Sequence, residues 1–169
     1  MLETYLEILE EGYYEAKFAF EGLADENVWK RPAEGILSMG ELAGHVAYWE
    51  GVRFAGEGGE PKPDPAKCRI KSPLIDVRFS YYPTTIATPP SEEHLSMSAA
   101  QVCDDFVRVH NEAIANLKTL NPDLDSSPLG FDPYYTYRVM LKYAIFHVDY
   151  HTGQMYTVRH LLGDQPTDN

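Results

Sequence analysis

The chain has 169 residues, 44% of them hydrophobic and 24% charged, which is the composition of a globular protein large enough to build one core. Its formal net charge of −12 argues against nucleic acid and anionic membrane surfaces as partners, because phosphate groups are bound by basic faces. No apolar run approaches the ~18 residues of a membrane span, and the two cysteines, Cys68 and Cys103, form no disulfide framework, which favours a reducing cytoplasm.

Residues 2–21 are predicted to form the first helix. Apolar side chains recur on one face of this segment, and glutamates occupy the other face. The acidic, amphipathic sequence is unlike a signal or transit peptide. Its inner stripe is Leu2, Leu6, Leu9, Tyr13, Ala16 and Phe20.

A second helix is predicted to begin at Ser38, because Glu41 follows three residues later in the capping-box pattern. His45 lies within an apolar stripe of this helix, close to Tyr48 and Trp49. Glu41 lies one turn before His45 and either caps the helix, the simpler interpretation, or orients an imidazole or acts as a base. Tyr48 and Trp49 either fill the core, which we favour, or line a pocket.

Residues 56–97 form the longest irregular stretch, with seven prolines. A strand is conceivable where Ile75, Val77, Phe79 and Tyr81 alternate, but Pro83 would end it. We expect an ordered crossover instead, since its apolar side chains need a buried place. Those side chains are Ile70, Leu74, Phe79, Tyr81, Tyr82 and Ile86.

A third helix is predicted from Ser98, capped with the help of Gln101, to about Leu120. Asn121 and Pro122 end it, and a turn-rich segment leads into the fourth helix. Cys103 is expected to be a small buried hydrophobe. The apolar stripe of this third helix is Val102, Phe106, Val109, Ala113, Leu117 and Leu120, with His110 at the edge as a hydrogen-bonded histidine.

The fourth helix is predicted over residues 134–163, where no proline interrupts and Gly163 provides a C-terminal stop. His147 and His151 lie four residues apart on its apolar face, the spacing at which two imidazoles share one metal ion. Gln154 lies at the side of this stripe, where it would hydrogen-bond a substrate or a neighbouring helix. The remaining histidines, His94 and His160, are expected to face solvent.

Four amphipathic helices and one long crossover predict an all-α four-helix bundle, with the crossover between helices 2 and 3, in a single domain over residues 1–169. Bundles assemble metal sites from side chains on facing helices. His45, His147 and His151 therefore have two interpretations, as ligands of one ion or as three core histidines satisfied by hydrogen bonds.

Two segments resemble the DinB-like metal-binding four-helix-bundle superfamily. The first ends at His45, and the second runs from His147 through His151 and Gly153 to Gln154. The resemblance implies a divalent metal, commonly zinc, nickel or iron, held by His45, His147 and His151. One departure is Thr152, where family members often carry an arginine, and it leaves substrate contacts open. The first segment comprises Leu23, Asp25, Trp29, Arg31, Pro32, Gly35, Ser38, Gly40, Glu41, Leu42 and His45.

Family members of known activity include transferases and isomerases that use low-molecular-weight thiols such as bacillithiol or mycothiol. Three neutral imidazoles also leave coordination positions open, as in catalytic sites. We therefore expect a metal-dependent small-thiol transferase or a related hydrolase acting on a small molecule. The alternative is a non-catalytic protein whose ion supports the bundle or senses metal supply. A homodimer is one of the assemblies open to it.

Overall fold

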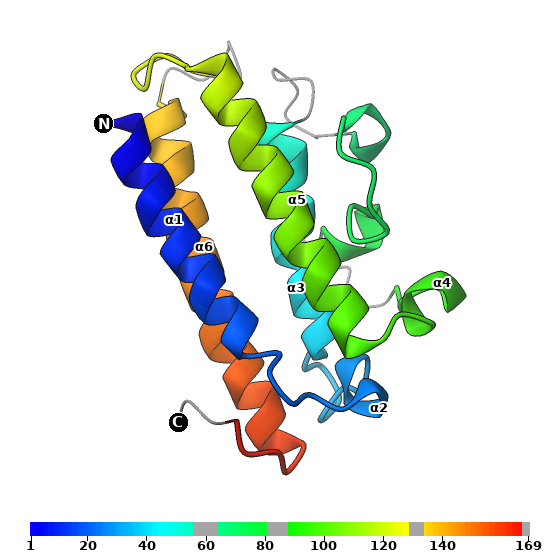
Figure 1. Ribbon diagram of the computed structural model, residues 1–169. Coiled ribbons are helices and arrows are strands. Elements are labelled where there is room, and N and C mark those ends of the chain that lie inside the picture. Colours follow the sequence, from blue (N-terminus) through cyan, green and yellow to red (C-terminus); the bar gives the residue numbers. More distant parts are fainter. Residues whose placement is uncertain (56–63, 81–87, 129–133, 167–169) are drawn as a thin grey trace.

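The computed structural model describes residues 1–55, 64–80, 88–128 and 134–166 (Figure 1). Two 3-10 turns, Pro65–Lys67 and Val77–Phe79, lie between the third and fourth helices in chain order. The helices are α1 (Leu2–Phe18), α2 (Asp25–Val28), α3 (Met39–Phe54), α4 (Glu92–Leu95), α5 (Ala99–Leu120) and α6 (Tyr137–Leu161).

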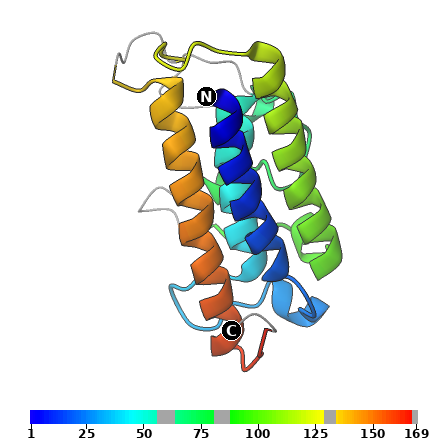
Figure 2. The same cartoon turned by 60° about the vertical axis from the view of Figure 1, so that its left-hand side comes forward.

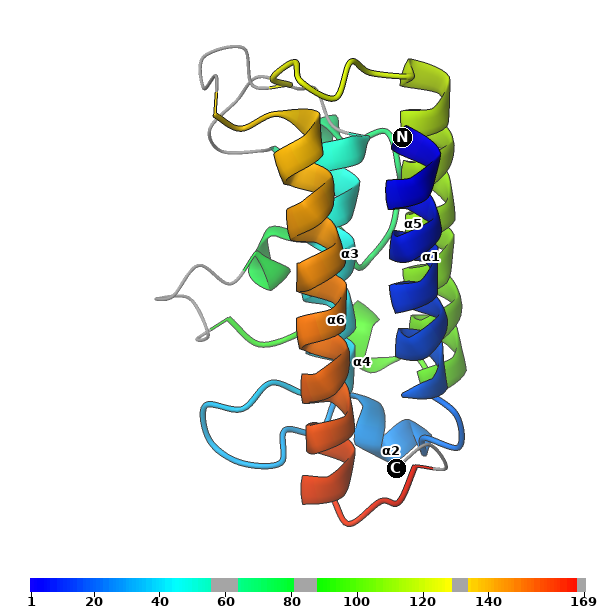
Figure 3. The same cartoon turned by 90° about the vertical axis from the view of Figure 1, so that its left-hand side faces the viewer.

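The four long helices pack as a bundle, and the described residues contain no β-strand, which confirms the predicted all-α class. Helices α1 and α6 run in one direction and α3 and α5 in the other, as the views in Figures 1 and 3 show. Helix α1 packs on α6, α3 packs on both α5 and α6, and α5 closes the ring against α1. Because α3 and α5 are parallel, the chain has to return along the bundle between them, and a long crossover follows.

None of the helices in the described part of the chain is long and apolar enough to cross a bilayer.

The predicted stripes form the core. Leu6 and Leu9 of α1 and Phe106 and Val109 of α5 are fully buried, and Met155 of α6 lies in the same cluster. Figure 2 shows α1 lying between α6 and α5, the position that buries this face. The hydrophobic pattern therefore placed the inward side of each helix correctly, except at the end of α5, where Leu120 of the predicted stripe is 53% exposed because it is the last residue of the helix.

Helix ends follow local capping. Ser38 and Glu41 form the predicted capping box, and so do Ser98 and Gln101. Helix α6 begins three residues later than predicted because the side chain of Thr136 accepts a hydrogen bond from the backbone N–H of Val139.

Three departures from the predicted helices are small. Helix α1 ends at Phe18 rather than at residue 21, and the chain then turns toward Gly22, whose φ is +70°. The four-residue helix α4 lies in residues 56–97, which were expected to be irregular, and the four-residue helix α2 lies between the first two predicted helices. None of the three changes the order of the four main helices.

The described part of the crossover is ordered against the bundle. Ile70, Leu74 and Phe79 are buried, and the segment Val77–Phe79 forms a 3-10 turn rather than a strand. Phe79 packs closely on Gly44 of α3, where an added Cβ would lie 2.7 Å from its ring. The expectations for residues 81, 82 and 86 lie outside the described residues.

The prediction that His94 faces solvent is wrong, whereas His160 is exposed as expected. His94 is 2% exposed because it belongs to the capping box of α4, with Ser91 at its Nδ1 and the carbonyl oxygen of Pro73 2.8 Å from its Nε2. Its ring also packs edge-on against Phe79. A capping box inside a long irregular stretch is easily overlooked, because no helical periodicity follows it.

A buried polar cluster joins α1, α3 and α5. Glu50 of α3 accepts a hydrogen bond of 2.5 Å from the hydroxyl of Tyr13, and its other oxygen lies 2.6 Å from Nδ1 of His110. The rings of Tyr13 and His110 stack with centroids 3.7 Å apart. Burial, reinforced by the charge of Glu50 and its hydrogen bond, raises the pKa of Tyr13 well above its usual value. His110 is thus hydrogen-bonded as predicted, but it is buried rather than at an edge.

Replacing this central carboxylate should destabilise the bundle. In Glu50→Leu the hydroxyl of Tyr13 and Nδ1 of His110 lose their partner, at a cost of roughly 1–3 kcal/mol for each buried group. The matched control is Glu112→Leu on the surface of α5, where an exposed ion pair with Arg108 is worth at most about 1 kcal/mol. Urea unfolding followed by circular dichroism measures both. Equal losses in the two variants would contradict the role assigned to Glu50.

Candidate metal centre

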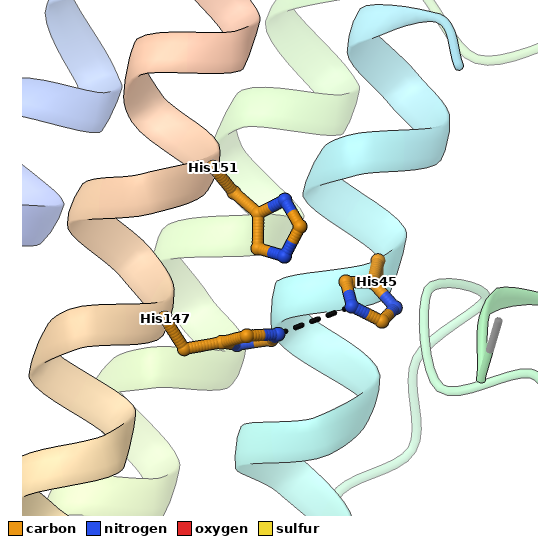
Figure 4. Close-up of side chains that lie close together, drawn as sticks. All are labelled: His45, His147 and His151. Carbon is orange, nitrogen blue, oxygen red and sulfur yellow. Dashed lines mark hydrogen bonds between the residues drawn. The ribbon is translucent and has the colours of Figure 1, made fainter. Parts of the chain in front are cut away.

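Three histidines converge between α3 and α6. His147 and His151 lie one turn apart on α6, and His45 faces them from α3 (Figure 4). His147 and His151 are buried, and His45 is partly buried. One ligand nitrogen from each lies within 4.8 Å of the other two. This is the grouping predicted from the helix faces.

The separations suit a single ion. The Nε2 atoms of His147 and His45 are 3.1 Å apart. An ion that binds imidazole nitrogens at about 2.0–2.1 Å in tetrahedral geometry holds them about 3.3 Å apart. The ring centroids of the three pairs are 4.5–4.9 Å apart, so the rings surround one small volume.

Two of the imidazoles have their outer nitrogen occupied. Nδ1 of His45 lies 2.8 Å from the carbonyl oxygen of Phe79, which only accepts, so Nδ1–H is the donor. Nδ1 of His151 lies 2.7 Å from Oε1 of Gln154, whose amide nitrogen donates in turn to the hydroxyl of Tyr150. A neutral ring that is protonated on Nδ1 presents an unshared pair on Nε2.

The donor set therefore fits a divalent ion that prefers nitrogen ligands. Two unshared pairs are directed into the same volume, and the nitrogen of His147 lies beside one of them. The outer hydrogen bonds resemble those that orient metal-binding imidazoles in proteins generally. Three core histidines satisfied only by one another would not need both outer nitrogens anchored.

The environment keeps these rings neutral. Burial lowers the pKa of His45 to about 4 and outweighs the raising effect of its hydrogen bond to Phe79. The charges of His151 and Arg53 lower this pKa by smaller amounts. Burial, with the neighbouring histidines and Arg53, lowers the pKa of His147 to about 2. Burial also lowers the pKa of His151. Metal ions bind unprotonated imidazole, so these shifts favour the ligand form at neutral pH.

The crossover holds the α3 side of the site. Two consecutive carbonyls, those of Phe79 and Ser80, accept hydrogen bonds from His45 and from the indole nitrogen of Trp49. Gly44 permits this approach, because any larger residue would meet the Phe79 ring. Sequence reasoning missed the role of Phe79, although a glycine next to a candidate ligand is a signal of close backbone or ring approach.

The other predicted pocket residues divide between structure and site. Glu41 is fully buried and caps α3, and Arg31 binds its carboxylate. Burial by itself would raise its pKa, but the hydrogen bonds from Arg31 and Ser38 outweigh that effect and lower it. Tyr48 is buried in the core, and Trp49 is anchored by Ser80, whereas Gln154 contacts a candidate ligand directly.

A cleft of about 480 Å³ lies beside the histidines, within the size range of small-molecule sites. The loop between α2 and α3 forms one wall and α6 the other. No carboxylate, lysine or arginine is among its described lining residues. They are Gly35, Ile36, Leu37, Leu42, His45, Tyr150, His151, Gln154, Thr157, Val158 and Leu161.

Comparison with known protein families finds the DinB superfamily. The model of the DinB superfamily matches residues 8–155, which is most of the chain and includes all three histidines. No curated protein and no solved structure matches the chain.

The metal-free protein should lose stability in mild acid. The pKa of a histidine in the unfolded chain is about 6.5, whereas burial lowers the pKa of His45 to about 4 and that of His147 to about 2 in the folded protein. The stability present above pH 6.5 therefore falls as pH drops toward 4, by up to about 1.4 kcal/mol per pH unit for each histidine. Urea unfolding in chelator from pH 7 to pH 4 measures it. His147→Leu should show a shallower decline, and identical slopes would contradict the assignment.

Replacing Gly44 by alanine should weaken metal binding. In Gly44→Ala the new methyl group displaces Phe79, so its carbonyl releases His45, and zinc affinity should fall roughly 10–100-fold. The control is Gly153→Ala on α6, where nothing lies within 4 Å and helix propensity should add about 0.5–1 kcal/mol of stability. Competition with a chromophoric chelator measures zinc affinity. An unchanged affinity in Gly44→Ala would show that Phe79 does not hold the ligand.

Proposed function

The chain belongs to the DinB superfamily, and on that premise we propose that it binds one divalent ion, zinc, nickel or iron, and uses it as an enzyme. The ligands are His45, His147 and His151. The reaction class is transfer of a small thiol to an electrophilic substrate, with hydrolysis as the close variant.

One observation carries this proposal. In His45 and His151 the ring proton lies on Nδ1, which donates a hydrogen bond to the carbonyl oxygen of Phe79 and to Oε1 of Gln154, respectively. Nε2 of each ring is therefore unprotonated. His147 brings a third nitrogen to the same place. Burying unprotonated nitrogens side by side among apolar side chains costs free energy unless a cation accepts their lone pairs.

The chemistry needs an open position and a nucleophile. A divalent ion held by three neutral imidazoles leaves at least one position open and, as a Lewis acid, makes a thiol or a water molecule a stronger nucleophile near pH 7. Gln154 keeps His151 in the required orientation and proton state, and Tyr150 supports Gln154.

The cleft favours a thiol over water. Its described lining carries no carboxylate to accept a proton from water, and Glu41 is occupied by the helix cap and Arg31. A thiol has an ordinary pKa near ~8.5 and needs less help to ionise. The apolar wall of Ile36, Leu37 and Val158 suits the uncharged body of an electrophilic substrate and excludes water from it.

A second candidate is a metal-binding protein without turnover. It is favoured by the structural roles of Glu41, Tyr48 and Trp49, which cap α3, fill the core and bind the crossover. Of the predicted neighbours, Gln154 is the one seen to bond a candidate ligand in the described part of the chain. In that case the ion braces α3 against α6.

Metal should stabilise the parent protein and not a ligand variant. At 100 times its dissociation constant, zinc or nickel should add about 2.7 kcal/mol to the parent. His151→Leu should lose this gain while keeping nearly the same stability in chelator, because Gln154 is partly exposed and can bond to water instead. Thermal melts with chelator and with added metal measure both. A variant that melts much lower in chelator, yet gains as much from metal, would exclude His151 as a ligand.

Turnover decides between the two candidates. The metal-loaded protein is incubated with low-molecular-weight thiols and electrophilic substrates, and separately with esters and amides. Activity that disappears in His147→Ala at unchanged helicity supports the enzyme. A fully loaded protein inert toward the whole panel supports the binding protein.

A further inference from the structure

Arg53 differs from the other arginines in its partners. The chain has seven arginines. Five of them pair with a carboxylate and Arg69 donates to the amide oxygen of Asn116, whereas within the described residues Arg53 contacts only aromatic rings. Because the chain has a net charge of −12, carboxylates are abundant, yet none of the described ones pairs with the guanidinium of Arg53. The five pairs are Arg31–Glu41, Arg78–Asp76, Arg108–Asp105, Arg138–Asp125 and Arg159–Asp164.

Three aromatic rings surround the guanidinium of Arg53. Its central carbon lies 4.6 Å from the ring centre of Trp49, 5.2 Å from that of Tyr143 and 5.9 Å from that of Tyr135. The rings attract the cation through their π-electrons, and no described carboxylate or carbonyl accepts a hydrogen bond from its N–H groups. Trp49 is itself fixed by the carbonyl of Ser80, so the group is positioned and not loosely exposed.

This cation lies next to the candidate metal centre. Tyr143, which Arg53 contacts, stacks on His147 with ring centroids 5.6 Å apart and an interplanar angle of 22°. Arg53 follows His45 by eight residues on α3, roughly 12 Å along the axis, and helical side chains lean back toward the N-terminus. The contact with Trp49, one turn earlier, shows this lean. Arg53 is also partly exposed, so a ligand can reach it.

We propose that Arg53 binds a carboxylate of the molecule that occupies the three-histidine site, so that the thiol used there is an acidic one. The proposal rests on the function proposed above. The planar guanidinium of arginine matches a carboxylate through two parallel N–H···O bonds. The uncharged cleft is then left for the electrophile, while Arg53 selects a thiol whose carboxylate lies several bonds from its sulfur.

The test uses cobalt(II), whose visible absorption changes when a thiolate binds, so the readout is binding and not turnover. The probes are ω-mercaptocarboxylates of increasing chain length, from 3-mercaptopropionate to 11-mercaptoundecanoate, each against the ω-mercaptoalcohol of equal length. At intermediate lengths the carboxylate should bind roughly tenfold to a hundredfold more tightly than the alcohol. Arg53→Met should remove this preference, and Arg53→Lys should remove most of it, because lysine lacks the planar fork.

The control is Lys142→Met, which removes the same charge from an exposed position on α6. It should keep the preference, because general attraction between the protein and an anion is not what the proposal requires. Equal loss in Lys142→Met and Arg53→Met would overturn the proposal. So would a parent that binds cobalt and thiols but shows no preference at any length, and this would leave the proposed metal function standing. A parent that takes up no cobalt would overturn the metal function and, with it, this inference.

Discussion

The site depends on where each imidazole carries its proton. A histidine buried among apolar side chains loses its charge, and a neutral ring has one donor and one acceptor nitrogen. The carbonyl of Phe79 and the amide of Gln154 take the donor side of His45 and His151, so the acceptor sides face inward. Without these two acceptors the same three residues would satisfy one another, and the cluster would be a hydrogen-bonded core.

This constraint explains why the crossover belongs to the site. Parallel packing of α3 and α5 forces the chain back along the bundle, and the returning segment places its 3-10 turn against α3. Buried Phe79 anchors that turn, and Gly44 makes room for it. The same helix carries Glu50 on its other side, in contact with α1 and α5. Helix α3 thus lies between the three histidines on one side and the Glu50 cluster on the other. The first group is completed by α6 and the crossover, and the second by α1 and α5.

Much of this could be predicted from the sequence, because helix faces and caps are local properties. The 3.6-residue period placed His45, His147 and His151 on inward faces, and Ser38 and Ser98 marked the starts of α3 and α5. Backbone acceptors leave no such mark, so the role of the Phe79 carbonyl was not foreseen. His94 was misplaced because its capping box lies outside any periodic segment. The partnership of Glu50, Tyr13 and His110 depends on the relative height of three helices, which periodicity does not give.

Packing of α1 against α6 has a consequence for the chain as it is made. These helices are neighbours in the bundle although more than a hundred residues separate them in sequence. A ribosome adds residues at about 5–20 per second, so the apolar face of α1 waits on the order of ten seconds for its partner. Two of the three histidines emerge in that same last helix. Core and ligand cluster are therefore completed in one event, and a nascent chain holds no three-histidine site before it has a closed bundle.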